Sequence, residues 1–200
     1  MKNHLQTFAI LLLPLATWAQ FGGTGGGATY TRWGSSKCPS TATLVYTGRA
    51  GGSFYSQGAA SNYLCMPKDP EYTLTTQAGI RGHSYVYGAE YHHPLKGAHD
   101  HNVPCAVCET LTRSQILMIP AKTSCPNSGW TKEYDGYLMS DYLGFQRTLY
   151  ECVDQEQESI PGSQISTDGA LFYHVEANCN GMPCPPYDAQ KELGCVVCSK

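Results

Sequence analysis

Ten cysteines divide the chain into two halves that share one spacing. The first set is Cys38, Cys65, Cys105 and Cys108, and the second is Cys125, Cys152, Cys195 and Cys198. In each set 27 residues separate the first cysteine from the second, and the last two form a Cys-x-x-Cys. The second half carries one extra pair, Cys179 and Cys184. An even number of cysteines at repeated spacings is typical of a disulfide framework.

The residues around the cysteines repeat as well, at an offset of about 87 residues. The segment at 46–48 (Tyr-Thr-Gly) matches 134–136 (Tyr-Asp-Gly), and 104–108 matches 194–198 around the two Cys-x-x-Cys motifs. A fixed period with shared flanking residues indicates internal duplication. We therefore expect two tandem homologous subdomains, at 28–118 and 119–200, that form one compact unit.

The composition favours strands over helices, because 14 tyrosines and 21 glycines suit short strands joined by tight turns. No helical periodicity longer than two turns is present. We expect a mostly β fold. The predicted strands are 43–46, 63–65, 84–87, 103–108, 115–119, 136–139, 148–153, 170–175 and 194–198.

The N-terminus predicts secretion. Lys2 precedes an apolar run at 8–15, and Ala19 is a small residue at a suitable cleavage position, so residues 1–19 are expected to be a signal peptide and 20–27 a Gly-rich leader. The apolar run is too short to span a bilayer, and no later segment is longer. With a net charge of −3 and no basic cluster, we expect a secreted, extracellular protein with no membrane span and no nucleic-acid partner.

Two pairings of the cysteines remain open from the spacing. Residues i and i+3 of a strand point to opposite faces, so each cysteine of a Cys-x-x-Cys needs its own partner. The nested pairing is Cys38–Cys108 with Cys65–Cys105, while the crossed pairing exchanges the partners. A four-thiolate zinc site is the third alternative, and the secretory compartment argues against it.

A histidine-rich segment is the candidate metal site. The residues that could bind a metal are His92, His93, His99, Asp100 and His101. Imidazole and carboxylate groups suit zinc or copper. The alternative is a polar surface loop without a ligand, and we predict no other cofactor.

Motifs for catalysis are missing, and we expect no enzyme. The segment at 51–55 (Gly-Gly-Ser-Phe-Tyr) lacks the closing glycine of a nucleophile elbow. Glu90 and Glu176 could suggest a two-carboxylate glycosidase, but the duplication already explains the pair. Trp33 and Trp130 could stack on sugars or belong to the core.

Four segments carry a family resemblance: 27–34, 60–72, 101–108 and 129–134. They resemble the C-terminal non-collagenous domain of invertebrate short-chain (spongin-type) collagens, which is distantly similar to the domain that ends type IV collagen. The resemblance covers about residues 25–200. No collagen tract is present here, because the glycines at 22–27 form only two triplets, too few for a triple helix.

The resemblance implies a function and a pairing. It implies the nested disulfides, with Cys125–Cys198, Cys152–Cys195 and the local pair Cys179–Cys184. It also implies a structural or interaction protein of the extracellular matrix that forms a homo-oligomer, a trimer or a hexamer, or binds matrix proteins or glycans. The alternative function is a secreted lectin-like or defence protein, with metal bound through the histidine-rich loop.

Overall fold

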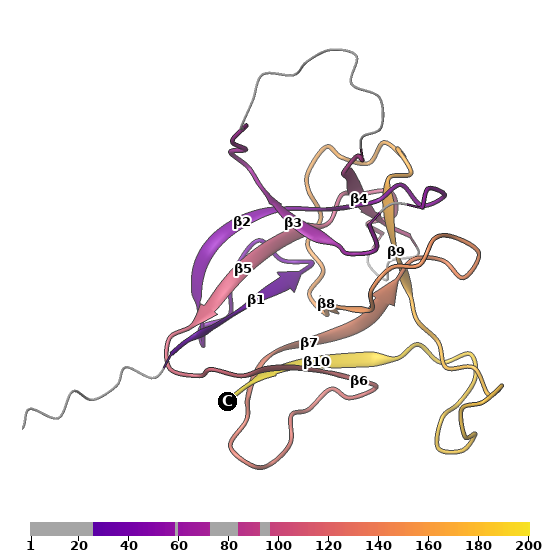
Figure 1. The fold of residues 1–200 in the computed structure, drawn as a ribbon. Coiled ribbons are helices and arrows are strands. Elements are labelled where there is room, and N and C mark those ends of the chain that lie inside the picture. The colour runs from indigo at the N-terminus through magenta and orange to yellow at the C-terminus, as the bar shows by residue number, and fades with distance from the viewer. Residues whose placement is uncertain (1–25, 59, 73–83, 93–96) are drawn as a thin grey trace, which may run out of the picture.

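The computed structural model describes residues 26–58, 60–72, 84–92 and 97–200, so the expected signal peptide and most of the leader lie outside the described residues. Ten strands and no helix occur in this part of the chain, which confirms a mostly β fold (Figure 1). The strands are β1 (Ala28–Trp33), β2 (Thr43–Gly52), β3 (Leu64–Pro67), β4 (Tyr87–Tyr91), β5 (Pro104–Thr110), β6 (Ile116–Pro120), β7 (Thr131–Ser140), β8 (Glu151–Asp154), β9 (Ala170–His174) and β10 (Gly194–Ser199).

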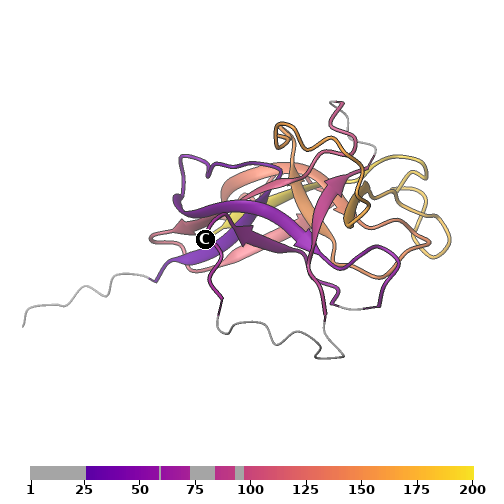
Figure 2. The same ribbon diagram turned by 90° about the horizontal axis from the view of Figure 1, so that it is seen from above.

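All ten strands belong to one mixed sheet with the order β6-β10-β7-β8-β1-β5-β2-β4-β9, and β3 pairs with β2. A further pairing of β7 with β9 closes seven of these strands, from β7 through β1 to β9, into a circuit. β4 and β9 run parallel and side by side at one end of the molecule (Figure 1). Seen from above, the curved strand β2 crosses over strands that come from later in the chain (Figure 2).

Strand prediction failed at two places. β1 was not predicted, because its buried residues Tyr30 and Trp33 are three positions apart and do not alternate with exposed ones. The predicted strand at 84–87 shares only Tyr87 with β4, which continues to Tyr91. The β4 residues Ala89, Glu90 and Tyr91 are all buried, so the period of two that marks a half-exposed strand is lost there.

Aromatic rings from both halves of the chain fill the core. Tyr63 stacks on Phe172 with ring centroids 4.1 Å apart, and Trp33 lies 6.2 Å from the same ring. The Tyr63 hydroxyl donates a 2.7 Å hydrogen bond to the Leu171 carbonyl, which satisfies its polar end inside the core. Trp33 is buried, as expected if it belongs to the core rather than to a sugar-binding surface.

All ten cysteines form disulfides, and no free thiol remains. The pairs are Cys38–Cys108, Cys65–Cys105, Cys125–Cys198, Cys152–Cys195 and Cys179–Cys184. This is the nested order, so the crossed pairing and the four-thiolate site are wrong. Each Cys-x-x-Cys lies on a strand, β5 or β10, and sends its two side chains to separate partners.

A buried carboxylate joins sequence-distant segments. Glu133 of β7 accepts hydrogen bonds from the hydroxyls of Tyr30, at 2.8 Å, and Thr41, at 2.6 Å. Arg113 and Ser199 donate to its other oxygen. Burial alone would raise the pKa of Glu133, but these four donors hold the pKa below its ordinary value. The carboxylate is therefore ionised and fully partnered inside the protein.

Candidate functional site

A histidine–carboxylate cluster, formed by His92, His99, Asp100 and Asp168, lies where β4 meets the segment before β9. His92 Nε2 is 3.6 Å from Asp100 Oδ1 and 3.7 Å from Asp168 Oδ1. His99 Nε2 is 3.3 Å from the same Asp100 oxygen. The nitrogen and oxygen ligand atoms of His92, His99 and Asp100 all lie within 4.8 Å of one another.

Backbone hydrogen bonds bring the cluster together at the base of a loop. The His92 N–H donates to the Phe172 carbonyl of β9 at 2.9 Å. The Tyr91 N–H donates to the His101 carbonyl and the Asp100 N–H donates to the Tyr91 carbonyl, both at 3.0 Å. The chain therefore leaves β4 at His92 and returns to the same place at Asp100.

The His92 ring is hydrogen-bonded at one nitrogen, Nδ1, and, within the described part of the chain, not at the other, Nε2. Its Nδ1 is 2.9 Å from the Tyr173 hydroxyl, while its Nε2 points at the two aspartates. Nε2 and Asp100 Oδ1 are both buried, and neither has a hydrogen-bond partner among the described residues. Burial, assisted by His99, lowers the pKa of His92, against the opposing effect of Asp100 and Asp168.

Glu90 is fully buried, and its carboxylate lies within 4.8 Å of ligand atoms of His92 and Asp168. Its carboxylate accepts hydrogen bonds from the backbone N–H and the hydroxyl of Thr167, next to Asp168. Glu90 therefore holds the segment that carries Asp168 against β4. Glu176, which occupies the matching position in the sequence repeat, is exposed, so the two glutamates have different environments.

The predicted metal ligands are only partly brought together. His92, His99 and Asp100 converge, whereas the Nδ1 of His101 lies 3.1 Å from the His99 carbonyl oxygen instead of facing the cluster. His93 lies outside the described residues. Asp168 and Tyr173 were missed, because they come from the second half of the chain and no motif there indicates proximity to the loop.

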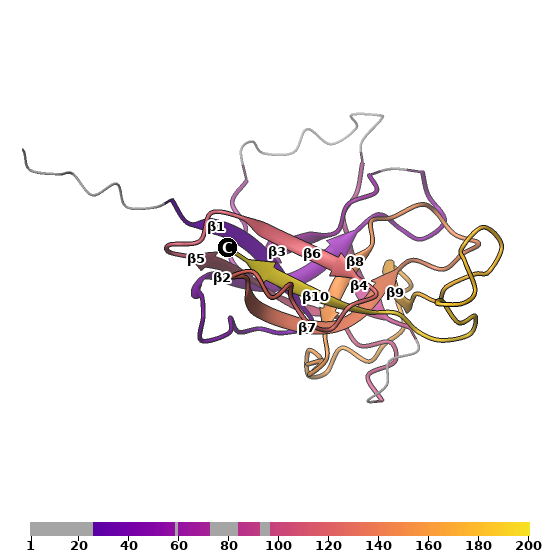
Figure 3. The same cartoon turned by 90° about the horizontal axis from the view of Figure 1, so that it is seen from below.

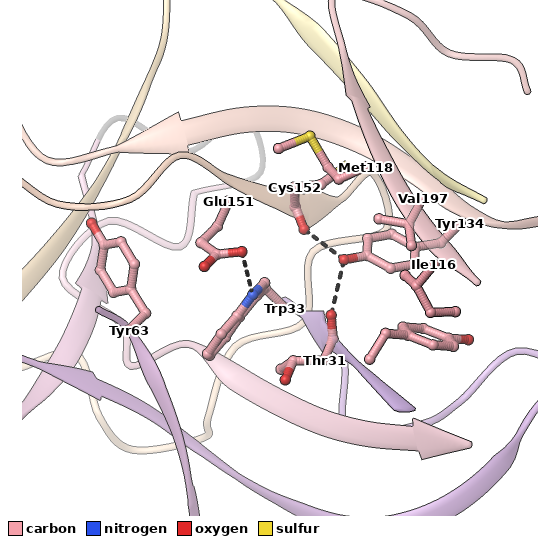
Figure 4. Close-up of a pocket in the computed structure, with 10 residues that line it drawn as sticks. Thr31, Trp33, Tyr63, Ile116, Met118, Tyr134, Glu151, Cys152 and Val197 are labelled. Carbon is pink, nitrogen blue, oxygen red and sulfur yellow. Dashed lines mark hydrogen bonds between the residues drawn. The ribbon is translucent and has the colours of Figure 1, made fainter. Parts of the chain in front are cut away.

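A cavity of about 270 Å³ is a second candidate site (Figure 4). Its lining residues are Tyr30, Thr31, Trp33, Tyr63, Ile116, Met118, Tyr134, Glu151, Cys152 and Val197. The Trp33 indole donates to Glu151 at 3.0 Å, and the Tyr134 hydroxyl contacts the carbonyls of Thr31 and Cys152 (Figure 4). The Trp33 indole N–H and the Tyr134 hydroxyl therefore donate to groups of the cavity wall and not to a ligand.

Two strand edges are free in the described part of the chain. β6 pairs only with β10, and β3 pairs only with β2. Seen from below, β6 lies beside β10 at the surface, close to the C-terminus (Figure 3). Both edges present apolar side chains, because Leu117 of β6 is 40% exposed and Leu64 and Met66 of β3 are 44% and 38% exposed.

No protein-family model matches the chain. Five disulfides without a free cysteine indicate an extracellular protein, since such bonds persist only in oxidising compartments. Among the described residues, no helix is long and apolar enough to cross a membrane.

Proposed function

We propose that this chain is a secreted structural or interaction protein of the extracellular matrix, which acts by associating with further copies of itself. The observation that carries the proposal is the pair of free apolar edges, β6 and β3. Exposed strand edges template pairing with another chain, and soluble proteins usually protect them with charged residues. β6 instead reads Ile-Leu-Met-Ile-Pro, without a charge.

A tandem duplication is part of this proposal, and the strand pairings support it. In the first half β5 lies between β1 and β2, and β2 also pairs with β3 and β4. In the second half β10 lies between β6 and β7, and β7 also pairs with β8 and β9. The order of connections is the same. Within this proposal, the pairing of β6 with β10 favours a boundary between the two repeats at residues 111–115 over one after residue 118.

Two glycines at matching positions give independent support. A Cβ on Gly48 of β2 would lie 2.0 Å from the Met66 carbonyl oxygen of β3. A Cβ on Gly136 of β7 would lie 1.9 Å from the Val153 carbonyl oxygen of β8. Both glycines thus allow the same close approach of a neighbouring backbone, at the positions that the repeated Tyr-x-Gly segments align.

The duplication suggests which strand edges meet when two separate chains associate. Inside the chain β1 of the first half contacts β8 of the second half, with Trp33 opposite Val153. The counterparts of β1 and β8 are β6 and β3, the two free edges. We infer that β6 of one protein chain lies along β3 of a second chain. Such a head-to-tail contact generates a ring when the rotation closes.

Two backbone N–H groups of β6 point away from β10 and could bond a further strand. Gln115 and Lys200 exchange backbone hydrogen bonds of 3.0 and 3.1 Å, and the Ala121 N–H donates to the Gly194 carbonyl at 2.8 Å. Antiparallel pairs alternate, so the N–H groups of Ile116 and Met118 point away from β10. These two donors face the free side of the strand.

The resemblance to the non-collagenous domain of spongin-type collagens supports the same function, since those modules associate with one another. A trimer or a hexamer is the expected assembly. The alternative, a lectin-like protein, loses support at Trp33, because this side chain is buried and its indole is hydrogen-bonded to Glu151.

Multi-angle light scattering on the purified secreted protein tests the proposal. Wild-type protein should elute as an oligomer, and Leu117→Lys or Met66→Lys should shift the mass toward the monomer, because each places a charge on one of the two edges. Leu143→Lys is the matched control, since Leu143 is 91% exposed on a loop outside both edges. A wild-type monomer at every concentration would refute self-association.

A further inference from the structure

We propose that the histidine–carboxylate cluster is a zinc site, in which His92 Nε2, His99 Nε2 and Asp100 Oδ1 bind the ion and Asp168 supplies the fourth ligand. The site would lie on the junction between β4 and β9. It is independent of the proposed self-association, because its residues lie outside β3 and β6.

The distances between the ligand atoms fit a tetrahedral ion. Zinc binds histidine nitrogen and carboxylate oxygen at about 2.1 Å, so the edges of the ligand tetrahedron measure about 3.4 Å. The edge from His99 to Asp100 is 3.3 Å. The edges from His92 to Asp100 and to Asp168 are 3.6 and 3.7 Å. His92, His99 and Asp100 therefore already form one compact group of ligand atoms, whereas Asp168 reaches this group only through His92 and would have to turn toward the ion.

The two central ligand atoms, His92 Nε2 and Asp100 Oδ1, are buried and make no hydrogen bond among the described residues. An unpaired buried polar atom costs about 1–3 kcal/mol, so such atoms in a folded protein call for an explanation. An ion between them satisfies both atoms at once.

The surroundings orient the ligands as an outer shell does in known sites. Tyr173 fixes the His92 ring through Nδ1, at 2.9 Å, and the Nδ1-protonated tautomer leaves the Nε2 lone pair free for a metal. Glu90 anchors Thr167 beside Asp168. The backbone of both aspartates adopts the left-handed conformation, with φ of 61° at Asp100 and 48° at Asp168, and both carboxylates lie within 3.7 Å of His92 Nε2.

The ligand set selects the class of ion. Two imidazoles exclude calcium and magnesium as preferred ions, since these choose oxygen ligands. Two nitrogen and two oxygen ligands in a tetrahedral arrangement suit zinc, although copper(II) binds such ligands with higher intrinsic affinity. When bound, zinc would close the base of the loop and tie it to the segment before β9.

Isothermal titration calorimetry of chelator-treated, full-length secreted protein with zinc chloride tests the site. The wild-type protein should bind one ion per chain. His99→Ala and Asp100→Asn should each weaken binding by more than about 100-fold, beyond the usual effect of losing an outer-shell partner. Asn tolerates the left-handed backbone at position 100, and His99 is 53% exposed on its side chain, so both variants should fold.

The matched control is His101→Ala, which removes a histidine from the same loop but not from the cluster. It should keep the wild-type affinity. Cobalt(II) added to the wild-type protein should give the strong visible absorption of a tetrahedral ion, and Asp168→Asn should reduce this absorption. Wild-type protein that binds no zinc, or equal losses in the His99 and His101 variants, would refute the site.

Discussion

The Tyr30 hydroxyl donates a 2.8 Å hydrogen bond to Glu133 across 103 residues of sequence. This contact connects β1, near the start of the folded chain, to β7 in the second half. Glu133 is buried, and its charge is compensated by Arg113 at 3.0 Å. The carboxylate is therefore a point where the two halves depend on each other.

Neutralising Glu133 should lower the free energy of unfolding. We expect Glu133→Gln to cost about 3 kcal/mol, the lower end of the range for breaking a buried ion pair, because Arg113 retains some contact with solvent. Tyr30→Phe should cost about 1.5–3 kcal/mol, as it removes one hydrogen bond to a charged group. Denaturant titration measures both. Lys132→Gln, which breaks an exposed ion pair with Asp135, should cost under about 1 kcal/mol, and an equal loss there would contradict the assignment.

Asp141 should make the protein less stable as pH rises, whereas a salt-bridged acid makes a protein more stable as pH rises. Burial raises its pKa to about 6, against the lowering effect of the hydrogen bond from the Tyr142 N–H. The folded state therefore holds the proton more tightly than the unfolded state, and the contribution of Asp141 to stability falls as pH rises from about 4 through about 6.

Asp141→Asn removes this titration while keeping an oxygen for the Tyr142 N–H. The free energy of unfolding of the variant, relative to wild type, should therefore be higher at pH 7.5 than at pH 4. Thermal melts at both values measure the difference. A constant offset between the two proteins across this range would disprove the prediction.

The disulfides should contribute unequally. Cys38–Cys108 spans 70 residues and Cys179–Cys184 spans five. In the chain-entropy description, closing these loops is worth about 4 and about 2 kcal/mol. We expect the double serine variant of the first pair to unfold at clearly lower denaturant concentration than that of the second pair. Similar midpoints for both variants would argue against this ranking.

Gly48→Ala and Gly136→Ala should destabilise the protein to a similar extent. In each case the new methyl group meets a backbone carbonyl of the paired strand, which can move only by distorting the sheet. Overpacking of this kind costs about 1–3 kcal/mol. Gly144→Ala, where the nearest atom is a Tyr142 ring carbon at 3.6 Å, should leave stability nearly unchanged. A neutral Gly136→Ala would weaken the case for the duplication.

Local sequence patterns predicted most of the strands and the cysteine framework, but they did not predict the pairing of β4 with β9 that helps to close the circuit of strands. The Cys-x-x-Cys spacing on strands required a separate partner for each cysteine, since side chains three apart point to opposite faces, but it left the nested and crossed pairings open. Nothing in the sequence predicts that β4 pairs with β9, because parallel strands are joined through distant segments. For the same reason the histidine-rich loop was recognisable, while Asp168 and Tyr173 were not.

The parallel pairing of β4 with β9 affects biosynthesis. During synthesis β4 precedes β9 by about eighty residues, so all four cysteines of the first half are made before the strand that pairs with the free edge of β4. The first half can thus be fully cross-linked and still lack a neighbour for β4. We therefore expect one edge of β4 to stay unpaired, and open to wrong pairing, until Ala170 and the residues after it arrive.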